Sequence, residues 1–141
     1  MGVRRSLVLA LVGVCVVPAA GGGVPAPPVI REPFTPLPCP AHPTATTEIE
    51  GCLERALLRS DRRIDARVAA IYQLLLDARD RVAFAAGERA WLTYRRRSCS
   101  AEASAYRGGS AAPLAYLRCQ LSRNERHLTD LAAMERALLR R

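Results

Sequence analysis

Few residues of this sequence could do chemistry, and they are scattered along it. The two histidines are His42, in a proline-rich segment, and His127, near the C-terminus, so they form no local constellation for acid–base catalysis. We interpret His127 as a residue on a helix surface or near a helix cap, and not as a catalyst. The sequence has no Gly-x-Ser-x-Gly elbow, no glycine-rich phosphate loop, and no Cys-x-x-Cys pair of the kind that binds zinc or works as a redox dithiol. We therefore predict a protein that is not an enzyme and that uses no metal or other cofactor.

Cysteine is the most informative reactive residue type in the chain. Of the five cysteines, Cys15 lies in an apolar N-terminal run and is either cleaved off or consumed by lipid attachment. An even set of four then remains, which in an exported chain indicates disulfides: Cys39, Cys52, Cys99 and Cys119. Three pairings are possible. We favour Cys39 with Cys52 and Cys99 with Cys119, because the second bond would tie two helices together across a glycine loop.

The N-terminus has the form of an export signal. Arg4 and Arg5 precede an apolar run over residues 7–17, which is too short to span a bilayer. We predict a signal peptide over residues 1–20, and two processing routes compete: cleavage after small residues near Ala20, or a lipid anchor at Cys15. Either route places the protein in the periplasm, in the cell envelope or outside the cell.

Charge is distributed unevenly along the chain. The formal net charge is +8, and all 21 basic residues are arginine. Residues 89–141 hold 11 arginines and 4 acids, so this half of the chain is strongly cationic. Such a surface could attract anionic lipid or wall polymer. Export argues against a nucleic-acid partner.

The length of 141 residues allows one domain. Only seven residues are aromatic, which favours helices over a β-sandwich. Residues 21–43 contain eight of the ten prolines and indicate a disordered linker, so we place the folded domain at residues 44–141. The domain should begin with a helix at Thr46 or Thr47, where Thr47 and Glu50 have the spacing of a capping box.

The apolar residues predict an all-α fold of three antiparallel helices stapled by two disulfides. The first helix should run to about Leu76, with a turn over residues 77–81. A second helix then carries Phe84 to Cys99, and residues 106–110 form the clearest break. The last helix opens around Pro113. The first and the last helix each carry an apolar stripe. The stripe of the first consists of Ile49, Leu53, Leu57, Ile64, Val68, Ile71 and Leu75, and that of the last consists of Leu114, Leu117, Leu121, Leu128, Leu131 and Leu138.

Two places in the predicted bundle are candidate sites. Glu88, Trp91 and Arg95 fall on one helix face, where Arg95 could pack on the indole ring beside a partner carboxylate in a buried polar network. Alternatively, this face is a recognition patch. The better candidate for partner binding is the loop Tyr106, Arg107, Gly108, Gly109 and Ser110, which presents one cation and one serine hydroxyl at a flexible tip. The loop could also be a plain turn with Ser110 as a helix cap.

Several of these features occur together in the order and spacing of a known family. They are the run from Glu88 to Arg95, the Gly-Gly-Ser of the loop, and the cysteines at 52, 99 and 119, with Ile64-Asp65 ahead of Tyr72. From about Cys39 to Leu131, the sequence resembles the exported bacterial family of lysozyme inhibitor LprI-like N-terminal domains. The resemblance implies a small helical, disulfide-bonded envelope domain, and the best-known member of the family is a lipoprotein that inhibits host-type lysozyme.

We predict an exported module of the cell envelope that binds a protein partner, such as a c-type lysozyme whose cleft it blocks. In that version Arg107 pairs with the two carboxylates of the cleft, while Tyr106 and Ser110 fill the space for sugar. The alternative is a module without inhibitory activity whose arginine-rich C-terminal half binds anionic lipid or wall polymer. Salt separates the two, because adhesion should vanish at a few hundred millimolar salt and a docked inhibitor should tolerate it.

Overall fold

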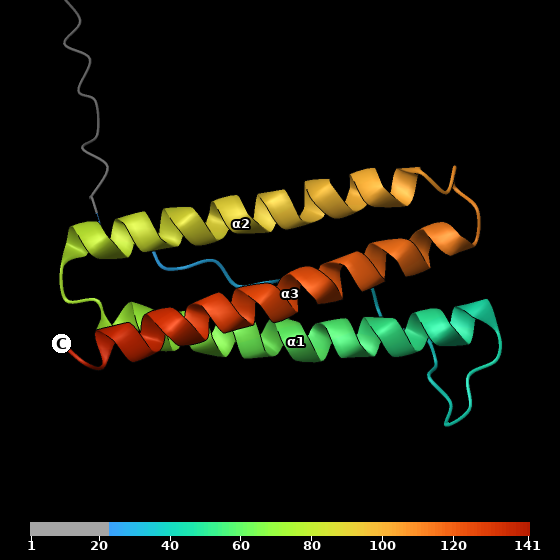
Figure 1. Cartoon of the computed structure of the whole chain (residues 1–141), viewed down its shortest axis with the longest axis horizontal. Coiled ribbons are helices and arrows are strands. Elements are labelled where there is room, and N and C mark those ends of the chain that lie inside the picture. Colours follow the sequence, from blue (N-terminus) through green and yellow to red (C-terminus); the bar gives the residue numbers. More distant parts are fainter. Residues whose placement is uncertain (1–22) are drawn as a thin grey trace, which may run out of the picture.

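The computed structural model of the chain describes residues 23–141, and they form three long helices and no strand. These are α1 (Thr46–Leu74), α2 (Ala78–Ser104) and α3 (Ala111–Leu138). Successive helices are antiparallel, so the start of α1 and the loop between α2 and α3 lie at one end of the bundle (Figure 1). The predicted all-α fold is confirmed for this part of the chain. The predicted signal peptide and Cys15 lie outside the described residues.

α1 begins where the sequence predicted, but its cap differs. The N-cap is Ala45, whose side chain has no acceptor, and the Glu48 carboxylate accepts hydrogen bonds from the backbone N–H groups of Thr44 and Ala45. These bonds lower the pKa of Glu48, that from Ala45 most. The capping box expected from Thr47 and Glu50 is therefore wrong by two residues, because Glu48 stands three residues after the N-cap and Glu50 does not.

The turn between α1 and α2 is shorter than expected. α1 ends at Leu74, and the side chain of Asp77 already caps α2 by accepting from the Arg79 N–H at 2.6 Å. Residues 78–81, predicted as turn, are the first turn of α2 because an aspartate N-cap satisfies the free amides of that turn. The break predicted at residues 106–110 is present, between the end of α2 and the start of α3.

α3 packs against both other helices, whereas α1 and α2 scarcely touch. The apolar core lies toward the end of the bundle that holds the α1–α2 turn. It consists of five buried residues: Ile64, Val68, Ile71, Leu75 and Leu131. Both predicted disulfides, Cys39–Cys52 and Cys99–Cys119, are present. No helix of residues 23–141 has both the length and the apolar character that crossing a bilayer demands.

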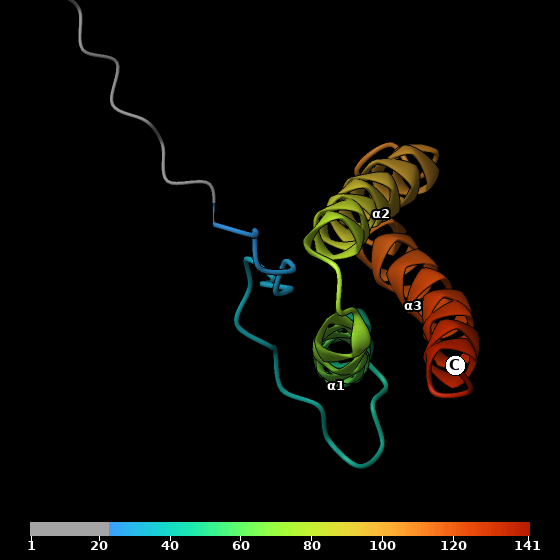
Figure 2. The same cartoon turned by 90° about the vertical axis from the view of Figure 1, so that its left-hand side faces the viewer.

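The proline-rich segment, residues 23–45, has no helix or strand, but it is not the free linker that the sequence suggested. It lies along α1 and α2 on the side away from α3 (Figure 2). The backbone N–H of Ile30 donates to Asp65, and that of Leu37 donates to Glu54, both on α1. Gly51 is required here, because a Cβ at this position would collide with the carbonyl oxygens of Leu37 and Pro38. We call residues 24–38 the strap.

Candidate functional site

The side chain of Arg95 lies at the centre of the bundle and joins four segments. Only 1% of the surface of Arg95 is exposed. Nη1 donates to Asp61 Oδ1 on α1 at 2.6 Å and to Asn124 Oδ1 on α3 at 2.9 Å. Nη2 donates to Glu32 Oε1 of the strap at 2.6 Å, and only 6% of the Glu32 side chain is exposed. One guanidinium on α2 therefore connects the strap, α1 and α3.

Asn124 extends this network between α1 and α3. Its Nδ2 donates to Ser60 Oγ at 2.6 Å and to Asp61 Oδ1 at 2.8 Å. Three buried polar side chains of residues 23–141 have atoms without a hydrogen-bond partner, namely Asp61 (Oδ2), Arg95 (Nε) and Gln120 (both atoms of its amide). We call Arg95 and its partners Glu32, Ser60, Asp61 and Asn124 the Arg95 cluster.

The carboxylates of this region outnumber the one buried cation. Burial raises the pKa of Glu32, and the nearby Asp61 adds to that rise against the opposing effect of Arg95. Burial likewise raises the pKa of Asp65, although the hydrogen bond from Ile30 opposes it. A charged carboxylate is costly to bury unless it has a cationic partner of its own. The carboxylates on the strap side of the bundle therefore take up protons more readily than free carboxylates do.

Trp91, His127 and Glu88 form a second group beside the Arg95 cluster, in which His127 and Glu88 are buried and Trp91 is half-buried. The indole stacks on the His127 ring at 3.8 Å between centroids, and the Arg95 guanidinium lies over the indole at 5.4 Å. His127 Nε2 lies 2.9 Å from Glu88 Oε2. The structure thus brings Glu88, Trp91 and Arg95 into one buried region, with Glu88 paired to His127 and not to Arg95. The expectation of a surface His127 is wrong, because ring stacking and a carboxylate partner offset its burial.

These buried groups hold the helices together through contacts between side chains. Arg95, Asp61 and Asn124 are each no more than 3% exposed. Within residues 23–141 no cluster of histidine, cysteine and acidic side chains has the arrangement of a metal site. Removing one partner of such a buried ion pair lowers the stability of the fold strongly. The arrangement is therefore suited to fixing the register of the strap and the three helices.

The loop Tyr106–Ser110 has the opposite character, since all five residues are exposed. Arg107 has a φ of 51°, in the left-handed region that non-glycine residues seldom adopt, and Gly108 follows with a φ of 75°. Backbone bonds from Arg107 N to Ser104 O and from Gly109 N to Tyr106 O hold this conformation. The Cys99–Cys119 disulfide closes the 20-residue segment that contains the loop. Ser110 is the N-cap of α3, but its side chain makes no capping bond.

The surface of the protein is more cationic than its composition indicates. Of the 13 acidic residues, the side chains of Glu32, Glu54, Asp61 and Glu88 are buried, whereas Arg95 is the one buried arginine of residues 23–141. The loop end is an exception. We define it as residues 46–55 and 98–118, and outside the buried residues it holds three acids and three arginines: Glu48, Glu50, Glu102, Arg55, Arg107 and Arg118.

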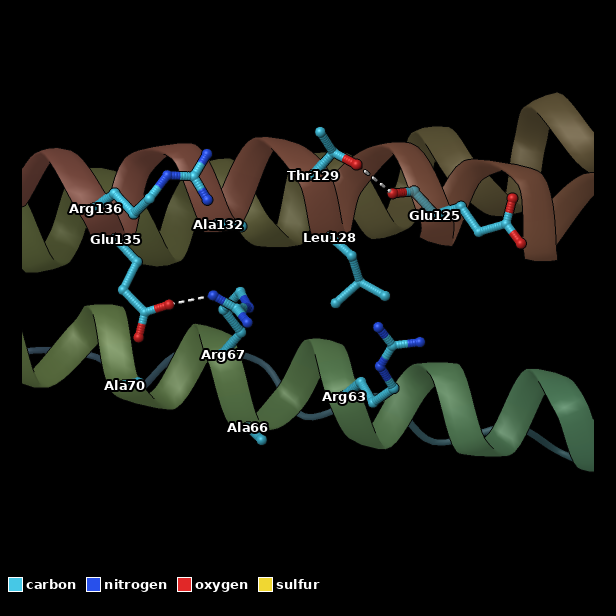
Figure 3. Close-up of a pocket in the computed structure, with 10 residues that line it drawn as sticks. All are labelled: Arg63, Ala66, Arg67, Ala70, Glu125, Leu128, Thr129, Ala132, Glu135 and Arg136. Carbon is cyan, nitrogen blue, oxygen red and sulfur yellow. Dashed lines mark hydrogen bonds and ion pairs between the residues drawn. The ribbon is translucent and has the colours of Figure 1, made fainter.

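Two hollows lie along the length of the bundle, away from the loop. One, of about 650 Å³, runs between α1 and α3 and is crossed by an ion pair between Arg67 and Glu135 (Figure 3). Its other charged side chains, of both signs, are Arg63, Glu125 and Arg136, and alanines of α1 and α3 also line it. The other, of about 520 Å³, lies between the strap and α2. The predicted loop residues contribute to neither.

Sequence reasoning missed Asp61, Asn124 and the docking of Glu32. A signal for the first two was present. The apolar stripe of α1 skips from Leu57 to Ile64, and that of α3 skips from Leu121 to Leu128. Asp61 and Asn124 occupy the helical positions that these two gaps leave open, so a polar residue in a skipped core position marks the cluster. No local pattern marks Glu32, because its partner is distant in the sequence.

Comparisons with known proteins give one family. The sequence model of the family described as lysozyme inhibitor LprI matches residues 39–131, which span α1, α2, most of α3 and all four disulfide cysteines. No curated protein and no solved structure matched the chain. Membership supports a lysozyme-inhibitor-like function at the level of the family and suggests lysozyme as a partner, and the two disulfides fit an exported protein. On this match, the chain belongs to the lysozyme inhibitor LprI family.

Proposed function

We propose that this protein inhibits a c-type lysozyme by placing the loop Tyr106–Ser110 in the substrate cleft, with Arg107 paired to the cleft carboxylates. The observation that carries the proposal is the conformation of Arg107, an exposed arginine held at positive φ at the tip of a disulfide-bounded loop. Strained backbone of this kind concentrates at functional sites. A guanidinium offers the planar fork of donors that carboxylates accept.

Electrostatics supports docking through the loop end. A c-type lysozyme is usually basic, and a partner surface with a large excess of arginine would repel it. At the loop end Glu48, Glu50 and Glu102 balance the arginines, so a basic partner meets less repulsion there than elsewhere on this protein. Arg107 then projects from a surface of nearly zero net charge toward the two carboxylates on which lysozyme depends.

The test is inhibition of cell-wall lysis by the exported, oxidised protein, measured at low and physiological salt. We expect saturable, stoichiometric inhibition at both. Arg107→Ala should weaken it about tenfold or more, because a hydrogen-bonded charge pair of this kind contributes about 1.5–3 kcal/mol. Arg79→Ala is the matched control, since it removes the same charge from an exposed position at the opposite end of α2. An inhibition constant unaffected by Arg107→Ala would refute the role of this loop.

Strain and charge at position 107 can be separated. Arg107→Gly removes the charge but suits a φ of 51°. Arg107→Lys keeps the charge and loses the fork. If the charge docks, the glycine variant inhibits as poorly as the alanine variant, and the lysine variant lies between these and the wild type. Full inhibition by the glycine variant would show that the loop shape matters and the guanidinium does not.

The second candidate is adhesion to anionic lipid or wall polymer without inhibition. The observation that favours it is the surface excess of arginine left by the four buried acids. Co-sedimentation with anionic vesicles or with purified wall polymer at rising salt tests it. Binding that disappears by a few hundred millimolar salt, in a protein that leaves lysozyme active, would support adhesion. Absence of binding at low salt would contradict it.

A further inference from the structure

The hollow between the strap and α2 is a cleft of about 520 Å³ with a strong excess of positive charge. We call it the strap cleft. Four arginines line it, against Glu32 as its single acid: Arg31, Arg89, Arg95 and Arg96. Glu32 is already engaged, because it accepts a hydrogen bond from Arg95 at the inner wall. The three remaining arginines form no ion pair with any carboxylate of residues 23–141.

These arginines are available to a ligand. Arg31, Arg89 and Arg96 are all exposed. Within residues 23–141 their guanidiniums make one hydrogen bond, in which Arg89 Nη1 donates to the Ala26 carbonyl at the long distance of 3.4 Å. Arg89 and Arg96 stand two helical turns apart on α2, so they lie on the same side of the cleft. Deeper in the cleft, Arg95 has a buried Nε with no partner among the described residues.

The other walls of the strap cleft are apolar or carry hydroxyl groups. Leu92 and Pro33 supply apolar surface, and Thr93 and Tyr116 supply hydroxyls. Burial raises the pKa of Tyr116, with a further rise from Glu32, so its phenol stays protonated and can donate a hydrogen bond. Paired arginines with apolar and hydroxyl walls suit an anionic group attached to a small polar body. Arginine binds phosphate oxygens through two parallel bonds.

We propose that the strap cleft binds a phosphate ester carried on a sugar-sized group, with Arg89 and Arg96 as the phosphate ligands and Tyr116 and Leu92 facing the organic part. The site is separate from the loop Tyr106–Ser110, and it does not rest on lysozyme inhibition. Either proposal can fail while the other stands. The ester could be a free metabolite or a unit of an anionic polymer, since both present the same group.

The test is a titration of the exported, oxidised protein with glucose 6-phosphate, followed by calorimetry and by the side-chain NMR signals of the arginines. Inorganic phosphate and glucose are titrated beside it. We expect saturation near or below about 1 mM for the ester, at least about tenfold weaker binding of inorganic phosphate, and no binding of glucose. A phosphate-linked wall polymer, titrated in the same way, shows whether the ester is also recognised within a polymer.

Neighbouring arginines of α2 provide a matched set of variants. Arg96→Gln and Arg89→Gln should each weaken binding of glucose 6-phosphate about tenfold. Arg97→Gln is the control, because Arg97 is also exposed and is adjacent in sequence but does not line the cleft. It should change affinity less than about twofold. Equal losses from all three variants would show diffuse attraction to a cationic surface and overturn the proposal, as would the absence of saturable binding or equal affinity for inorganic phosphate.

Discussion

Arg95 and Arg107 lie at the middle and just beyond the end of α2, and their surroundings are opposite. Arg95 is buried, touches the strap and two other helices, and meets two carboxylates within 2.6 Å. Arg107 is exposed, has a left-handed backbone, and lies where the helices end. The same residue type thus fixes the architecture in one region and is free to meet a partner in the other. Arginine content alone says nothing about which role an arginine has.

The two regions are also held by different forces. The Arg95 cluster depends on buried ion pairs and hydrogen bonds among four segments, all distant in sequence. The loop end depends on a disulfide and on local backbone bonds. Changes at the centre should therefore reduce stability and leave the binding surface unaltered in any protein that still folds, whereas changes in the loop should do the reverse.

The largest effect should come from Arg95→Met, which leaves Asp61 and Glu32 buried without their cation. We expect a loss of about 3–5 kcal/mol in the free energy of unfolding, measured by urea denaturation. Arg107→Met is the control and should change the same quantity by less than about 0.5 kcal/mol, because its side chain is exposed. Similar losses from the two variants would remove the contrast between the regions.

Removal of the Cys99–Cys119 disulfide should have the next largest effect. Cys99→Ala with Cys119→Ala should cost about 3 kcal/mol, because the bond closes a 20-residue segment. It should also weaken lysozyme inhibition, since the loop lies inside that segment.

Cys39→Ala with Cys52→Ala is the matched comparison for this variant. It opens a 13-residue segment beside the strap and should cost a similar amount of stability. Inhibition by the surviving folded protein should be retained. Equal loss of inhibition in both double variants would contradict the assignment of binding to the loop.

A smaller effect is expected from the N-caps of α1 and α3. Ala45 has the extended backbone of an N-cap but no side-chain acceptor, so Ala45→Ser should stabilise the protein by about 1 kcal/mol in thermal unfolding. Ser110→Ala should be nearly neutral, because the Ser110 hydroxyl makes no capping bond. A marked loss from Ser110→Ala would show that this hydroxyl caps α3 in solution.

The smallest effect should be a pH dependence that belongs to the strap side of the bundle. Burial raises the pKa of Glu32 and of Asp65, so the folded protein binds protons at pH values where the unfolded chain has lost them. The free energy of unfolding should therefore rise as pH falls below neutral through the raised pKa values of these two carboxyl groups. Glu48 has a lowered pKa and acts in the opposite sense only at more acidic pH.

Glu32→Gln tests the origin of this pH dependence. The amide keeps an oxygen that can accept the bond from Arg95 and cannot titrate, so the rise in stability should become smaller. Urea denaturation at several pH values measures it. An unchanged profile in Glu32→Gln would assign the protons to other groups.

Sequence reasoning found the features that local patterns carry. Helix periodicity located the buried apolar residues of α1 from Leu57 to Leu75, and cysteine spacing led to both disulfides. The predicted length of the α1–α2 turn was wrong, because the polar first turn of α2 resembles a loop until Asp77 is recognised as its N-cap. The strap could not be predicted, because proline-rich composition indicates disorder and the contact of Glu32 with Arg95 depends on the assembled bundle.

If Arg107 pairs with the carboxylates of the lysozyme cleft, the two side chains must be energetically coupled, and a double-mutant cycle measures that coupling. The cycle combines Arg107→Ala here with a change of either cleft carboxylate to an amide in lysozyme, with binding measured by calorimetry so that loss of enzyme activity is irrelevant. We expect a coupling energy of about 1.5 kcal/mol or more for at least one carboxylate. Coupling below about 0.5 kcal/mol for both would contradict it, since independent sites add within that range.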